Sequence, residues 1–361
     1  MTTIPHPAPG RVEVAGGVDT HRDSHTAAAV DAVGRVLGHQ EFPATAAGYR
    51  QLLGWLRRFG VLRLVGVEGT GAYGAGLARY LTAEGVALVE VDRPNRKARR
   101  SAGKSDPLDA EAAARAALAQ VQTGVPKDRT GQVEALRNLR VARRSAVDQR
   151  ADCQRQIKSL IVTAPERLRA GLRGHPTRQL ISTCAGLRPD PTRASDPEQA
   201  VKIALRSLAR RHLALSEEIA ELDALIGPLV TAINPDLIAR TGVGPDVAGQ
   251  LLVSAGQNTD RLHSEAAFAM LCGVAPLPAS SGRTDRHRLN RGGDRQANAA
   301  LYRVVISRLR WDPRTRAYAE RRTQQGLSKK DIIRCLKRLV ARELYYLLRP
   351  APPISDLPAS A

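Results

Sequence analysis

The chain has 361 residues, which is enough for two or three domains with cores of their own. Lys and Arg number 55 against 35 Asp and Glu, and the resulting formal charge of +20 indicates a polyanionic partner, for which nucleic acid is the leading candidate. The four cysteines lie far apart without ligand spacing, which argues against a zinc site or a disulfide framework. No signal-peptide pattern or membrane-length apolar run is present, so we expect a cytoplasmic, nucleoid-associated protein.

The first third of the chain predicts an α/β domain over residues 11–125, preceded by a Pro-rich, disordered tail at 1–10. Short apolar runs separated by Gly predict a hairpin that turns near Gly34. Apolar spacing then alternates between helix and strand. The predicted elements are strands at 11–19, 26–42 (a hairpin), 61–68 and 86–92, and helices at 45–60, 74–85 and 109–120. This order matches an RNase H-like fold.

Acidic residues stand at the ends of these elements. Asp19 and Glu68 each end an apolar run, and Asp106 and Asp109 lie three apart at a helix start. In the predicted fold these positions converge at one edge of the sheet. Each acid alone is commonly a cap or a turn former, and Asp106 before Pro107 is a good N-cap. Because buried unpaired carboxylates are costly, their conjunction favours a shared divalent metal site.

A basic run leads directly into this helix start. It contains no acid and comprises Arg96, Lys97, Arg99, Arg100 and Lys104. Such a run is often only a solvated face. Beside a metal site it would guide a phosphate backbone, so we favour a nucleic-acid contact.

Residues 130–230 are highly charged and predict helical arms. Apolar positions alternating at four and three form a heptad seam, which is typical of a coiled coil; they are Val201, Leu205, Leu208, His212, Leu215, Ile219, Leu222 and Ile226. The expected partner helix is 132–160, and the three prolines of 184–197 predict a loop between the arms.

Residues 235–348 predict a mainly α domain, followed by a disordered tail at 349–361. The pattern around Gly242-Val243-Gly244-Pro245 is compatible with a helix-hairpin-helix element and equally with an ordinary αα turn. Further on, Ser280-Ser281-Gly282 precedes arginines that could stabilise charge on a phosphate. These are Arg283, Arg286, Arg288, Arg291 and Arg295. By spacing alone, this segment is more often just a loop.

The motifs GVDTH, VEGTGAYG and KSDPLDA resemble the DEDD motifs of insertion-sequence transposases of the "IS one-ten" class. PLPASSG followed by RGGDRQANAAL resembles the serine-bearing C-terminal domain of the same class. The resemblance runs in order from about residue 14 to 345. That class includes the pilin-gene invertase and the bridge-RNA-guided recombinases.

The resemblance implies a RuvC-like N-terminal domain whose Asp19, Glu68, Asp106 and Asp109 bind Mg²⁺ and act in catalysis. It implies a nucleophilic serine that forms a covalent phosphoserine link to DNA, with Ser281 the best match and Ser280 the fallback. It also implies composite sites in a dimer or tetramer, joined through the coiled coil, and a noncoding guide RNA that pairs with donor and target DNA. Residues in the Arg-rich loop after Ser281 cannot be matched one by one.

We therefore expect a DNA transposase or site-specific recombinase. One alternative is a RuvC-like, metal-dependent nuclease such as a junction resolvase, in which Ser281 is structural. Another is a non-catalytic nucleic-acid-binding scaffold.

Overall fold

A computed structural model describes residues 12–91, 105–121, 123–283 and 287–349. The chain divides into two compact units, the first comprising residues 1–131 and 255–263 and the second residues 132–254 and 264–361. The basic run at 96–104, Arg286 and the two predicted disordered tails, apart from Arg349, lie outside the described residues. No helix in the described ranges is both long and apolar enough to cross a membrane.

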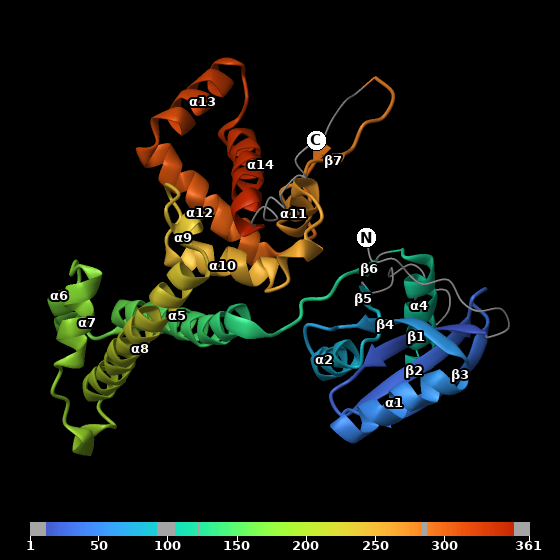
Figure 1. The fold of residues 1–361 in the computed structure, drawn as a ribbon. Coiled ribbons are helices and arrows are strands. Elements are labelled where there is room, and N and C mark those ends of the chain that lie inside the picture. Colours follow the sequence, from blue (N-terminus) through green and yellow to red (C-terminus); the bar gives the residue numbers. More distant parts are fainter. Residues whose placement is uncertain (1–11, 92–104, 122, 284–286, 350–361) are drawn as a thin grey trace. The chain divides into compact units, whose positions relative to one another are not determined.

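The first unit is built on a six-stranded mixed sheet with the order β3-β2-β1-β4-β5-β6 (Figure 1). Strands β1, β4 and β5 are parallel, whereas β2, β3 and β6 join antiparallel. The elements are β1 (Glu13–Thr20), β2 (Ser24–Asp31), β3 (Val36–Pro43), α1 (Ala46–Arg58), β4 (Val61–Glu68), α2 (Ala75–Ala83), β5 (Leu88–Val91), α4 (Asp106–Ala119) and β6 (Thr123–Gly124). The predicted order is confirmed, except that β6 was not predicted because two residues carry no pattern.

The two faces of this sheet pack differently. On one face, Leu52 and Leu56 of α1 and Leu77 of α2 join alternate residues of the strands in an aliphatic core. On the other face lies α4, whose buried residues are Asp109 and four alanines. Because alanine side chains are short, α4 can approach the sheet closely.

Two glycines make that approach possible. Gly17 of β1 and Gly66 of β4 are paired in the sheet. A Cβ on Gly17 would lie 2.1 Å from the backbone nitrogen of Ala114, and one on Gly66 would lie 2.7 Å from the carbonyl oxygen of Ala113. The backbone of α4 therefore rests directly on the sheet, and its N-terminal turn is brought to the ends of β1 and β4.

Gly17→Ala tests this packing. We expect the free energy of unfolding to fall by about 3 kcal/mol, because the new methyl group must push α4 off the sheet. The measurement is thermal or urea unfolding. Gly54→Ala is the control, since Gly54 is exposed on α1 with nothing within 4 Å of its Cβ position, and helix propensity there should raise stability by about 0.5–1 kcal/mol. Equal stabilities of the two variants would contradict the close contact.

The second unit begins with two long helices, α5 (Gly131–Thr163) and α8 (Pro197–Ile233). Cys153 of α5 packs with Leu215 of α8, and further along Ile157 packs with Leu205, so the helices run antiparallel. All eight positions of the predicted seam on α8 are buried or half-buried.

The connection between these helices is longer than predicted. Two helices that were not predicted, α6 (Glu166–Leu172) and α7 (Thr177–Ala185), precede the predicted loop at 184–197, which holds one 3-10 turn at Pro191–Arg193 between α7 and α8. Leu168, Leu172 and Leu180 pack against the ends of the long helices. Both helices are short and begin directly after a proline, Pro165 for α6 and Pro176 for α7. Of the three prolines of 184–197, Pro197 is the first residue of α8.

An ion cluster joins α5 to the remainder of this unit. Asp246, in the first turn of α10 (Pro245–Ala255), pairs with Arg140, Arg143 and Arg303. Burial alone would raise the pKa of Asp246, but the arginines outweigh it and lower the pKa below its ordinary value. The cluster therefore stabilises the folded unit above the ordinary carboxyl pKa, and this contribution is lost as the pH falls through the lowered value.

Asp246→Asn should lower the free energy of unfolding by about 2–4 kcal/mol at pH 7, because three arginines lose a shared partner. Asp223→Asn is the matched control. Asp223 pairs only with Arg143 among the ion pairs in the described ranges, and its side chain is 48% exposed, so we expect less than about 1 kcal/mol. Thermal unfolding at pH 7 measures both, and equal losses would contradict the central role of Asp246.

The remaining elements of the second unit are mostly helical (Figure 1). They are α9 (Pro235–Ile238), α11 (Glu265–Leu271), β7 (Leu277–Pro278), β8 (His287–Arg288), α12 (Arg295–Trp311), α13 (Pro313–Gln324) and α14 (Lys329–Leu348). These helices agree with the mainly α domain predicted for residues 235–348. Helix α13 was not predicted, because Thr315 is its only buried residue and the sequence there shows no apolar face.

Candidate functional site

Two of the predicted acids end neighbouring parallel strands. Side chains alternate between the faces of a strand, so Asp19 lies on the same face as Gly17, and Glu68 on the same face as Gly66. Both glycines face α4. The hydroxyl of Thr20 donates to the carbonyl oxygen of Glu68 at 2.8 Å and ties the two strand ends together. The carboxylates of Asp19 and Glu68 therefore lie on the face that α4 covers.

The head of α4 brings the other two acids to this edge. Ser105 takes the N-cap position, so Asp106 and Asp109 both lie in the first turn. This corrects the alternative in which Asp106 is the N-cap. Asp109 is 7% exposed, and both acids act electrostatically on Asp19. Close packing of α4 on Gly17 and Gly66 thus assembles acids from three separate segments.

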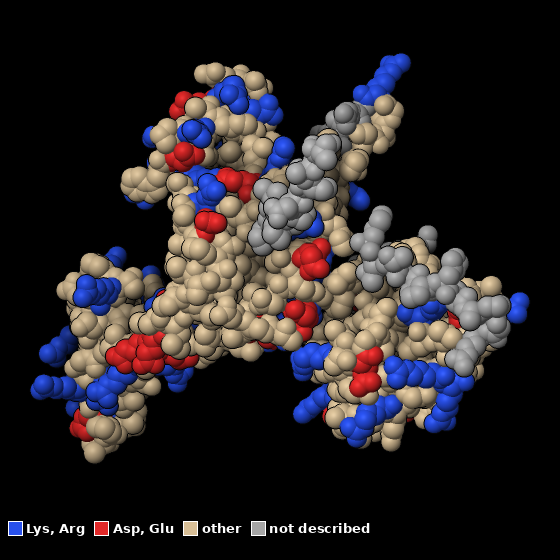
Figure 2. All heavy atoms as spheres, in the orientation of Figure 1, with Lys and Arg blue, Asp and Glu red and all other residues tan. Residues whose placement is uncertain are grey.

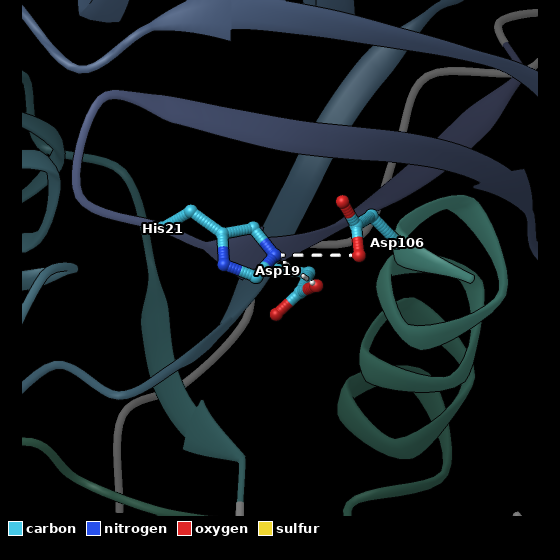
Figure 3. Close-up of side chains that lie close together, drawn as sticks. All are labelled: Asp19, His21 and Asp106. Atoms are coloured by element: carbon cyan, nitrogen blue, oxygen red, sulfur yellow. Dashed lines mark ion pairs between the residues drawn. The ribbon is translucent and has the colours of Figure 1, made fainter. Parts of the chain in front are cut away.

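A histidine completes the cluster (Figure 3). The Nε2 atom of His21 lies 3.2 Å from Oδ2 of Asp19 and 3.3 Å from Oδ1 of Asp106. One ligand atom from each of these three residues lies within 4.8 Å of the others. His21 is the member of this cluster that the sequence analysis missed. The sequence could have indicated His21, because a residue two positions after Asp19 points to the same side of an extended chain.

The electrostatics of the cluster favour a cation. Burial raises the pKa of Asp19, His21 lowers it, and the nearby charges of Asp109 and Asp106 raise it again, leaving it above its ordinary value. The His21 Nε2 is shielded from solvent and faces both carboxylates. Converging carboxylates with an imidazole nitrogen between two of them fit a divalent metal, for which these atoms are ordinary ligands. Glu68 lies outside the group of three and has a partner of its own.

The predicted serine lies in the second unit, on a hairpin formed by β7 and β8. Ser281 is exposed, and Gly282 follows it with φ +57°, a left-handed conformation that suits glycine. Arg283, Arg288, Arg291 and Arg295 are also exposed on this hairpin or just after it. The structure therefore places the serine at the surface, among most of the arginines that the sequence predicted.

The base of this hairpin is firmly held. The Asn298 side chain of α12 donates to the carbonyl oxygens of Cys272 and Gly273, at 2.9 and 3.0 Å, and accepts from Lys337 of α14 at 2.9 Å. Gly293, with φ +83°, has no room for a Cβ, which would lie 2.6 Å from the carbonyl oxygen of Leu271. These contacts fix both ends of segment 274–292 and leave the serine-bearing part exposed.

Two protein-family models match parts of the chain. A DEDD transposase family model of the IS110 type, described as a transposase, matches residues 16–164 and so includes the carboxylate cluster. A second, described as the IS116/IS110/IS902 transposase family, matches residues 237–320 and includes the serine hairpin.

Two curated proteins are similar to parts of the chain. "Insertion element IS110 uncharacterized 43.6 kDa protein" of Streptomyces coelicolor is 32% identical over 151 residues, which cover 41% of this chain and 37% of that protein. "Insertion element IS900 uncharacterized 42 kDa protein" of Mycobacterium paratuberculosis is 26% identical over 155 residues, covering 42% and 39%. The chain thus matches well under half the length of each relative. Because both family models match in order and each contains one of the two sites, the chain belongs to the IS116/IS110/IS902 family of transposases.

Proposed function

We propose that this protein is a DNA transposase that cuts and rejoins DNA through a covalent phosphoserine intermediate, with a divalent metal assisting. The observation that carries the proposal is the convergence of Asp19, Asp106 and Asp109 with the end of β4 on one edge of the sheet. A second matched domain with an exposed serine supports transposition over simple hydrolysis, which needs no such domain.

The metal is Mg²⁺ in this proposal, held by the carboxylates of Asp19, Glu68, Asp106 and Asp109. Hard oxygen donors are what Mg²⁺ prefers, and a bound ion polarises a phosphate and neutralises developing charge. His21 orients the carboxylates of Asp19 and Asp106 or adds a nitrogen ligand, since its Nε2 faces both. The arrangement corresponds to an RNase H-like, RuvC-like domain.

The serine chemistry is an exchange of phosphodiester bonds. The Ser281 hydroxyl oxygen attacks a DNA phosphorus, a P–O bond to serine forms and the P–O bond to the leaving strand breaks. The serine proton ends on the released sugar hydroxyl, so no cofactor is consumed. Attack by a strand hydroxyl on the phosphoserine reverses the exchange and joins new partners. The surrounding arginines stabilise the negative charge on the phosphate.

The partners are donor and target DNA, with a noncoding guide RNA pairing to both. The excess of 55 basic over 35 acidic residues supports polyanion binding. The contacts in this proposal include Arg96, Lys97, Arg99, Arg100, Lys104 and Arg286 together with the arginines of the hairpin. Helices α9 and α10, with the turn at Gly242-Val243-Gly244-Pro245, would form the helix-hairpin-helix element. In this proposal the subunits associate through the outer face of the α5–α8 coiled coil, because the α8 seam itself packs against α5 of the same chain. A DNA substrate would place the protein in the cytoplasm with the nucleoid.

The test is a trapping assay. The protein, Mg²⁺, RNA from the flanks of its gene and labelled DNA containing the element ends are incubated and separated under denaturing conditions. A labelled band at the mass of protein plus DNA is expected, and chelation of the metal should abolish it. Cleaved DNA without an adduct would instead establish a metal-dependent nuclease. Binding without cleavage would leave only a nucleic-acid-binding scaffold.

A further inference from the structure

One exposed surface of the second unit has no role in the two sites described above. It is the bend between α12 and α13, whose residues Arg310, Trp311, Arg314 and Arg316 we call the α12–α13 corner. Of the two tryptophans in the chain, Trp55 is 7% exposed in the core of the first unit, whereas Trp311 is 67% exposed. A large aromatic ring left in solvent marks an interaction surface in a protein with only 3% aromatic residues.

The charge of the corner restricts the partner. Four arginines and one aspartate lie between residues 308 and 316. That aspartate, Asp312, is the N-cap of α13, where its carboxylate accepts hydrogen bonds from the backbone nitrogen and the hydroxyl of Thr315. Arg310, Arg314 and Arg316 are exposed and form no ion pair within the described ranges. Figure 2 shows Lys and Arg side chains over α13, with a few acidic ones among them.

The geometry of the ring suits a planar partner. The Arg310 guanidinium carbon lies 4.8 Å from the centre of the Trp311 ring, so a cation already lies over one face of this ring. An aromatic ring flanked by arginines is the usual platform on which unpaired bases stack while the phosphates contact the cations. In a duplex the bases are already stacked on one another, so their faces are not available to such a ring.

A groove continues from the corner. It has a volume of about 550 Å³, and its walls include Arg240, Arg314 and Tyr318, with Leu336 and Leu339 of α14 as apolar lining. Arg314 belongs to both the corner and the groove. The groove is also lined by Asp312, which caps α13, and by Glu343, which pairs with Arg308. Arg314 and Arg240 are thus its cations for the phosphates of a strand bound at the corner.

We propose that the α12–α13 corner is a binding surface for an unpaired nucleic-acid strand, with Trp311 stacking on a base. This deepens the proposed function by naming where a single strand is held. A second copy of the chain fits less well, because it would bring the same arginines against these.

The test measures binding of a labelled 12-nucleotide oligothymidylate, its oligouridylate counterpart and a 12-base-pair duplex to the full chain. The single strands should quench the fluorescence of Trp311, and Trp311→Ala should weaken their binding by about 5- to 100-fold, the loss expected for one stacked base. Trp311→Phe should retain most of the affinity. Tyr346→Ala, which removes a comparably exposed ring from α14, is the control and should change affinity less than twofold.

Each outcome of these measurements either supports or overturns the proposal. Equal binding by the wild type and Trp311→Ala, or equal losses for duplex and single strands, would overturn the proposal. If Trp311→Ala sediments as a smaller assembly than the wild type and binds single strands unchanged, the corner is a contact between copies of the chain and the proposal is wrong. Adduct formation is measured separately. If the wild type forms no adduct while Trp311→Ala weakens strand binding, only the proposed function is refuted. If the wild type forms the adduct while Trp311→Ala binds single strands as the wild type does, only this inference is refuted.

Discussion

Asp19→Asn is expected to reduce DNA cleavage and adduct formation by at least about 10³-fold, since a metal at such a site lowers the activation barrier by several kcal/mol. Asparagine has the same shape but lacks the charge that a divalent ion requires. The fold should be retained. Because burial and the neighbouring acids already raise the pKa of Asp19, a neutral side chain relieves an unfavourable charge, and the melting temperature should stay the same or rise.

Cleavage rates, metal titration and thermal unfolding check this prediction together. Asp23→Asn is the control, since the Asp23 side chain is 93% exposed just beyond β1 and should not alter any of the three. Cleavage by Asp19→Asn within tenfold of the wild type would contradict the metal site. A large fall in melting temperature with lost activity would show instead that Asp19 is structural.

Ser281→Ala is expected to abolish the covalent adduct completely, because alanine has no oxygen with which to form the phosphodiester bond. DNA binding should remain within about twofold, since Ser281 is exposed and the arginines that surround it are untouched. The trapping assay measures the adduct, and a filter-binding or anisotropy titration measures affinity.

Ser280→Ala is the companion variant, because Ser280 is the neighbouring hydroxyl on the same exposed segment. It should retain the adduct. If Ser280→Ala loses the adduct and Ser281→Ala keeps it, the nucleophile is Ser280. If both variants cut DNA at the wild-type rate, strand cleavage does not proceed through either serine, and hydrolysis at the carboxylate cluster becomes the better explanation.

Much of the first unit could be predicted from local patterns. Alternating apolar residues, Gly turns and the 3.6-residue spacing of helices are short-range signals, so the order from β1 to α4 followed from them. Asp19 and Glu68 were recognisable because each ends an apolar run. Elements without a clear apolar periodicity were missed, as in the Arg-rich α13 and the short helices α6 and α7.

The sequence by itself determined the strand ends that carry acids, the long helical arms and the basic charge, because these depend on residues close together in the chain. Only the tertiary structure decided which groups meet. His21 contacts Asp106 across 85 positions because paired Gly17 and Gly66 let α4 lie against the sheet. Likewise, Asp246 gathers arginines from two other helices, and Trp311 stays in solvent while Trp55 is buried. Such contacts depend on packing between distant segments, which spacing along the chain does not encode.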